Sequence, residues 1–220
     1  MHRRRRRIAL AVSSVALLAA TPLLTACGND ARPGAAAVVG GDRITVAQLE
    51  SRVSEVRDAQ RAATSDDTQY AQAIASTGGL TRDTLHTLVL DRVVHRAATD
   101  AGVHVTRKQV QDARTGLEQQ AGGAKQLEAA WLQQYSVAPE RVDESLRTEL
   151  EAQELAKRLG ADMNTSAGQA TFWKALSDAS KALDVDLNPR YGTWDVEKSR
   201  RADAKTPWIR EVTSAGNKQA

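Results

Sequence analysis

Apolar residues recur at steps of three and four positions along most of the chain, which is the spacing of a buried stripe on an α-helix. Two stripes start with a capping box, a Thr followed three residues later by a Gln, at Thr45 with Gln48 and at Thr106 with Gln109. Between residues 58 and 79 the spacing is lost, which predicts a fraying helix end and a mobile loop. The whole pattern predicts helices over about residues 45–57, 81–101, 106–121, 127–135, 139–160 and 166–183.

Short extended segments are predicted at both ends of this helical region. Residues 36–39 and 43–44 flank Gly40-Gly41, and glycine tolerates the positive φ angles of a tight hairpin. Near the C-terminus, residues 184–194 show a short alternation of apolar and acidic positions, then a turn and a strand. The predicted fold class is therefore mostly α, with short strands at the two ends of one domain.

The last part of the chain has a different composition. From residue 195 onward the sequence is charged and aperiodic, with Trp208 as its one large aromatic residue. Such a segment buries too little apolar surface to offset the entropy of ordering, so residues 197–220 are predicted to be a disordered tail. The folded domain is predicted to span residues 37–196.

The N-terminal segment has the order of an export signal. Five arginines, Arg3 to Arg7, precede an apolar run from Ile8 to Leu24, and small residues precede Cys27. The run is short and contains Pro22, so it is a poor membrane-spanning segment. The alternative is an ordinary signal peptide in which the cysteine is incidental.

This segment resembles a bacterial lipoprotein signal. The resemblance implies cleavage of residues 1–26, a diacylglycerol thioether on Cys27 and a membrane attachment made by lipid. Two acyl chains suffice for stable anchoring, so the chain after Cys27 need not enter the bilayer. Residues 27–36 are small and polar, and they are predicted to be a flexible tether on an extracytoplasmic membrane face.

Charge and cysteine content limit the possible functions. The chain has 30 Lys and Arg against 27 Asp and Glu, and five Arg precede Cys27, so the chain from Cys27 onward has a net charge of −2. No basic face is left to predict a nucleic-acid partner. Cys27 is the only cysteine, which excludes a disulfide framework and a Cys-based zinc site.

Residues with catalytic or metal-binding potential are few. The chain has no nucleophile elbow, no phosphate loop and no His-Glu-x-x-His helix. His86 and His95 lie nine residues apart on one predicted helix, too far to share a metal, so surface or packing roles are favoured. The prediction is no catalytic residue, no metal and no cofactor other than the lipid on Cys27.

Two aromatic pairs could contact a client polypeptide. They are Trp131 with Tyr135, and Phe172 with Trp173. Aromatic rings bury a large apolar area with few rotatable bonds, which suits a binding groove. Core packing is the favoured alternative for either pair taken alone.

Three phrases of the sequence resemble the SurA and PrsA chaperone family. The segment 37–49, Ala-Val-Val-Gly-Gly-Asp-Arg-Ile-Thr-Val-Ala-Gln-Leu, is similar to the family's opening strand pair and capped helix. The link at 101–110 and the Asn-Pro-Arg-Tyr-Gly-Thr-Trp segment at 188–194 are similar to its later phrases, in the same order. The resemblance covers about residues 36–196 and implies a helical chaperone domain whose C-terminal strand returns to pair with the N-terminal one.

The chain departs from that family where SurA and PrsA insert a prolyl-isomerase (parvulin) domain. The insertion would fall between Gly160 and Asp184, and the 23 residues between them are far fewer than the ~50 residues of a small domain. The predicted function is a lipid-anchored, extracytoplasmic, chaperone-like protein that binds unfolded or newly exported polypeptides without catalysis. The alternatives are a structural or adaptor lipoprotein that holds one folded partner, and a degenerate prolyl isomerase.

Overall fold

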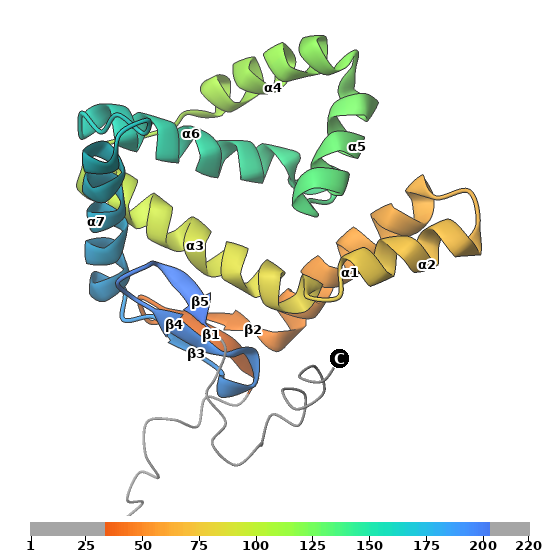
Figure 1. Ribbon diagram of the computed structural model, residues 1–220, viewed down its shortest axis with the longest axis horizontal. Helices are drawn as coiled ribbons and strands as arrows, with labels where there is room; N and C mark the ends of the chain where they lie inside the picture. The colour runs from red at the N-terminus through yellow and green to blue at the C-terminus, as the bar shows by residue number, and fades with distance from the viewer. Residues whose placement is uncertain (1–33, 203–220) are drawn as a thin grey trace, which may run out of the picture. The chain divides into compact units, whose positions relative to one another are not determined.

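The computed structural model describes residues 34–202, and within them the chain is mostly helical, as predicted (Figure 1). The α-helices are α1 (Val46–Ala63), α2 (Asp67–Ser76), α3 (Leu80–Asp100), α4 (Arg107–Ala121), α5 (Ala124–Tyr135), α6 (Val142–Arg158) and α7 (Ser166–Ala182). The strands are β1 (Ala35–Val39), β2 (Asp42–Thr45), β3 (Asp186–Leu187), β4 (Thr193–Asp195) and β5 (Arg200–Ala202), and the short 3-10 turns are η1 (Pro139–Arg141) and η2 (Pro189–Tyr191). None of the helices in this part of the chain is both long enough and apolar enough to cross a membrane.

The ends of the domain meet in a three-stranded antiparallel sheet with the order β2-β1-β3. β1 and β2 form the predicted hairpin, with Gly40 and Gly41 at φ angles of 63° and 87° in its turn. β3 pairs with the other edge of β1, and Leu187 lies opposite Ala37. The predicted returning strand is thus confirmed, and it covers a β1 strand that is buried along its whole length.

The C-terminal part differs from the prediction in its partners and its extent. β4, which contains Trp194, pairs with β5 and not with the N-terminal strands. The predicted start of the disordered tail at residue 197 is therefore wrong, because residues 196–199 form the turn of a hairpin and Arg200–Ala202 form β5. The two arginines of β5 made the sequence look like a solvated tail. In the structure, backbone hydrogen bonds with β4 keep this segment in a strand. The rest of that tail, with Trp208, lies outside the described residues.

The N-terminal boundary also differs by two residues. β1 begins at Ala35, so Ala35 and Ala36 belong to the sheet and not to the predicted tether of residues 27–36. Both side chains are buried. Small side chains permit this close packing, and the same small side chains gave the segment the composition of a linker. The signal segment 1–26 and Cys27 lie outside the described residues.

The helix ends follow the predicted local chemistry. Both capping boxes are present, and in the first the Thr45 hydroxyl accepts from the Gln48 N–H at 3.0 Å while the Gln48 side chain accepts from the Thr45 N–H at 2.8 Å. Gly102 follows the α3 C-cap residue Ala101 and has a φ of 72°, and the Val103 N–H donates back to the Ala98 carbonyl at 2.8 Å. This pair of features is a Schellman C-cap, which glycine favours because it has no Cβ.

The prediction of a fraying end and loop over residues 58–79 is wrong. α1 continues to Ala63, and α2 occupies Asp67–Ser76. α2 has no buried residue, so its sequence lacks the regular spacing of apolar residues that would predict a helix. It is held instead by polar contacts: the Asp66 carboxylate caps it by accepting from the Gln69 N–H at 2.8 Å, and the Arg57 guanidinium donates to the Thr77 carbonyl at 3.0 Å.

The core is organised around α3, which packs against α1, α6 and α7. A first cluster joins the sheet, α3, α7 and the C-terminal half of α6, and it includes Val39, Val93, Leu155, Leu176 and Leu187. A second joins α4, α5 and the N-terminal half of α6 through Val105, Val110, Leu127, Val142 and Leu146. A third, of Val56, Leu80, Leu132 and Ala138, joins α1, the start of α3 and the end of α5.

Candidate functional site

The first aromatic pair lies at the C-terminal end of α5. Trp131 and Tyr135 are one helical turn apart, and their ring centroids are 5.5 Å apart in an edge-to-face arrangement. Trp131 packs against the second cluster, whereas Tyr135 is 56% exposed. Trp131 therefore anchors a ring that faces solvent.

The second pair, on α7, has the same division of roles. Phe172 is buried in the first cluster, and Trp173 is 45% exposed. Their ring centroids are 5.8 Å apart, again edge to face. Core packing thus accounts for one ring of each pair, and the other ring is available for contact.

The structure does not combine the two pairs into one groove. α5 and α7 lie on opposite sides of the view in Figure 1, and the pairs pack on different clusters. The domain therefore offers two separate exposed rings, each in edge-to-face contact with a ring that packs on a core cluster.

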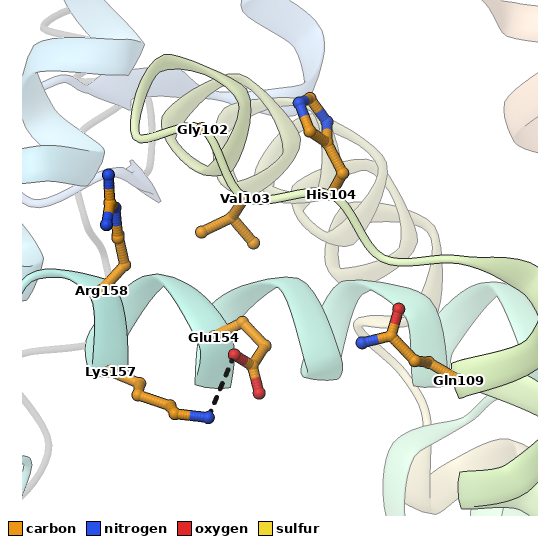
Figure 2. A pocket seen from close by; sticks show the side chains of 7 residues that line it. All are labelled: Gly102, Val103, His104, Gln109, Glu154, Lys157 and Arg158. Atoms are coloured by element: carbon orange, nitrogen blue, oxygen red, sulfur yellow. Dashed lines mark ion pairs between the residues drawn. The ribbon is translucent and has the colours of Figure 1, made fainter.

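One cavity lies between α6 and the segment that links α3 to α4. It has a volume of about 570 Å³, and Figure 2 shows its lining residues, with Val103 directed toward α6 and His104 directed away from it. The lining is mostly polar and includes an ion pair between the Lys157 ammonium and the Glu154 carboxylate at 3.5 Å. Such a surface is mostly polar and offers little apolar area to a client.

A second cavity of about 480 Å³ lies between α3 and α6, beside the turn of the β1–β2 hairpin. Its polar lining includes Asp91 and His95 from α3 and Glu144 and Glu151 from α6. Glu151 is buried, and its carboxylate is 3.0 Å from the His95 Nδ1. No pattern in the sequence indicates this cluster, because residues more than 50 positions apart come together only when α3 packs on α6.

Electrostatics set Asp91 apart from the other carboxylates of this cavity. Burial raises the pKa of Asp91 to about 6, a hydrogen bond from Thr148 opposes the rise, and the nearby Glu144 carboxylate adds to it. Glu144 itself is paired with the Arg52 guanidinium at 2.8 Å. Asp91 is therefore a half-buried carboxylic acid that titrates close to neutral pH.

The histidines occupy the surface and packing roles that the sequence favoured. His95 is exposed, and His86 packs beside the Trp194 ring with centroids 5.6 Å apart. Within residues 34–202, no group of three or more His, Cys, Asp or Glu side chains could hold a metal ion.

Comparison with known proteins assigns the chain to a family. A family model described as the SurA-like N-terminal domain matches residues 2–156. The chain belongs to this family. No curated protein and no solved structure matches the chain.

SurA-like N-terminal domains are chaperone-type modules, typically located outside the cytoplasm. The matched range begins in the predicted export signal and ends near the end of α6. Trp131 and Tyr135 thus lie inside the SurA-like match, whereas α7, with Phe172 and Trp173, and the returning strand lie beyond it. The part beyond the match is still integral to the domain, because α7 and β3 contribute to the first cluster.

Proposed function

We propose that this protein is a lipid-anchored, extracytoplasmic chaperone-like protein that binds unfolded or newly exported polypeptides without catalysis. Membership of the SurA-like N-terminal domain family carries this proposal. The binding surface consists of the two exposed rings, Tyr135 on α5 and Trp173 on α7.

The two rings suit an unfolded client for a physical reason. Each is held by a second aromatic residue that is packed on a core cluster, so little side-chain entropy is lost when a client binds. Aromatic residues dominate binding energy at protein interfaces. Two weak sites on one domain can be engaged together by one flexible chain, which raises the overall affinity without sequence specificity.

The membrane attachment is assigned to Cys27. The family match extends into the basic and apolar segment before it, which supports reading this segment as part of the protein's family architecture. Cys27 precedes the first described residue, Gly34, by seven positions. Such a short spacer would keep the domain close to the bilayer surface.

The lack of catalysis is assigned from the connection between α6 and β3. Residues 159–165 link α6 to α7, and α7 is the only helix between α6 and β3. This short connection supports the proposal that no prolyl-isomerase domain is inserted between α6 and β3. The purified protein should not accelerate cis/trans isomerisation of a prolyl test peptide, and an acceleration proportional to its concentration would contradict the assignment.

Client range separates this proposal from the adaptor alternative. Substoichiometric to equimolar protein should delay the aggregation of several unrelated unfolded proteins, measured by light scattering. An adaptor would delay none of them and would instead bind one folded partner in a fixed ratio.

Two variants locate the binding surface in the same assay. The double variant Tyr135→Ser with Trp173→Ser should raise the concentration needed for half-protection by ~30-fold, because each exposed ring that is removed costs about 1 kcal/mol of binding free energy. Lys174→Ser is the matched control, because Lys174 is an exposed neighbour of Trp173 that pairs with Asp178. Equal protection by the double variant and the control would refute the assignment of these rings.

A further inference from the structure

The β4–β5 hairpin is a small unit held by few contacts. It pairs only three residues on each strand, from Thr193 opposite Ala202 to Asp195 opposite Arg200. A two-stranded hairpin of this size is marginal in water by itself. Its ordered position therefore depends on the groups that dock it onto the helices.

Contacts with α7 and with α3 dock it, together with an ion pair between Lys181 of α7 and Glu197 in the hairpin turn at 2.9 Å. On α7, the Ser180 hydroxyl accepts from the Trp194 indole N–H at 3.0 Å and is 3.3 Å from the Ser199 hydroxyl, and both serines are fully buried. On α3, the His86 Nδ1 accepts from the Arg201 backbone N–H at 3.3 Å, and the imidazole lies beside the Trp194 ring.

The contact at His86 requires the neutral imidazole. A nitrogen that accepts a hydrogen bond carries no proton, so the proton of this ring is on Nε2. Protonation of Nδ1 would place two N–H donors face to face. It would also create a positive charge in a half-buried position close to the Arg201 side chain.

The charged groups around His86 act in opposite directions. Burial and the Arg201 guanidinium lower the pKa of His86, and the Asp83 carboxylate, one turn earlier on α3, raises it by less. Together these groups lower the pKa of His86. Docking of the hairpin and protonation of His86 therefore oppose each other.

We propose that the β4–β5 hairpin is a pH-sensitive latch, docked on α3 and α7 while His86 is neutral and released when the imidazole gains a proton. The latch follows from the fold alone and holds whether or not the domain binds clients. Release would uncover Trp194 and the faces of α3 and α7 beneath it. An extracytoplasmic domain would meet such pH changes directly.

Hydrogen–deuterium exchange of the full-length chain in detergent micelles tests the latch. Protection of residues 193–202 is compared at about pH 7.5 and about pH 5, on either side of the usual histidine pKa, after correction for the intrinsic exchange rate. The undocked population should rise at the lower pH, by up to about 30-fold, because about pH 5 lies about 1.5 pH units below the usual histidine pKa. Protection of α1 should stay the same, because the loss is local.

Two variants make the test specific. His86→Asn keeps an acceptor near the Nδ1 position but does not titrate, so protection of the hairpin should become independent of pH. His95→Asn is the matched control, because His95 lies on the same helix and also uses Nδ1, toward Glu151, but is exposed. Its hairpin should respond to pH as in the wild type.

Three results would overturn the latch: unchanged hairpin protection in the wild type at the lower pH, loss of protection spread evenly over the domain, or an undiminished pH response in His86→Asn. Should His86→Asn fail to fold, the NMR titration of His86 in the wild type decides. A pKa at or above the usual histidine value of about 6.5 would refute the proposal, and a lower one would support it.

Discussion

Replacement of Leu187 tests whether the returning strand closes the domain. Leu187 is 7% exposed, lies opposite Ala37 in the sheet and belongs to the first core cluster. Leu187→Ala removes three carbon atoms from that cluster and leaves the backbone pairing of β3 with β1 intact. The variant should therefore lose stability only through the apolar contacts that Leu187 makes.

The expected loss in the free energy of unfolding follows from the burial of Leu187. A buried Leu→Ala change costs about 2 to 5 kcal/mol, because it removes apolar contacts and leaves a cavity. In a domain of this size, each kcal/mol lowers the melting temperature by about 2 to 4 °C, so the midpoint should fall by ~4 to 20 °C. Typical domain stability is about 5 to 15 kcal/mol, so the variant should fold but with a greatly reduced margin.

Asp186→Ala is the matched control, because Asp186 is the adjacent residue of the same strand and its side chain is exposed. It should change the free energy of unfolding by less than about 0.5 kcal/mol. The measurement is urea denaturation followed by circular dichroism, with the slope m compared among the three proteins. If Leu187→Ala unfolds at the same urea concentration as Asp186→Ala, β3 does not close the core and the packing argument fails.

Three further predictions concern the tail, the anchor and the α3–α6 cavity. Truncation after Ala202 should leave the melting temperature unchanged, whereas truncation after Asp195 removes β5 and should lower it; equal midpoints in a thermal melt would contradict the docking contacts of the hairpin. Cys27→Ala should abolish incorporation of a labelled fatty acid and release the protein from the membrane fraction, and retention of a cleaved form would argue against the lipid anchor. Asp91→Asn should stabilise the domain by about 1 to 3 kcal/mol at about pH 8, because a raised carboxyl pKa means that Asp91 contributes stability below about pH 4 and loses it as the pH rises through about 6. A stability difference that stays constant between pH 4 and 8 would contradict the raised pKa.

Local chemistry made much of the fold predictable from sequence. Thr45 with Gln48 and Thr106 with Gln109 mark helix starts because both hydrogen bonds of a capping box form within four residues. Gly102 marks a helix end because its left-handed conformation is costly for other residues. These signals need no knowledge of distant parts of the chain.

The elements that were missed are those whose stability comes from distant or polar contacts. α2 has no buried side chain, and Arg57 of α1 holds its end through the Thr77 carbonyl. β5 is two arginines and an alanine, and its order depends on pairing with β4 and on the imidazole of His86, which is 115 residues from Arg201. Hydrophobic periodicity carries no trace of such contacts.

The candidate site shows the same limit. The sequence placed Phe172 and Trp173 next to each other but could not tell which ring is buried, because adjacent residues on a helix point about 100° apart and the buried face depends on the partners of α7. The cavity with Asp91 and Glu151 is invisible in the sequence because each residue belongs to a different helix with an ordinary polar face.

α6 explains how one domain can hold the two exposed rings far apart. Its N-terminal half contributes Val142 to the second cluster, on which Trp131 supports Tyr135. Its C-terminal half contributes Leu155 to the first cluster, which contains Phe172, the support of Trp173. Leu155 lies thirteen positions after Val142, a rise of about 20 Å along the helix axis, so the two clusters are held apart by a rigid element. A folded partner would need a matching rigid spacing to engage both rings, whereas an unfolded chain can adjust its own length between them. Under the proposed function, this spacing is an argument for extended, flexible polypeptides as clients over a single folded partner.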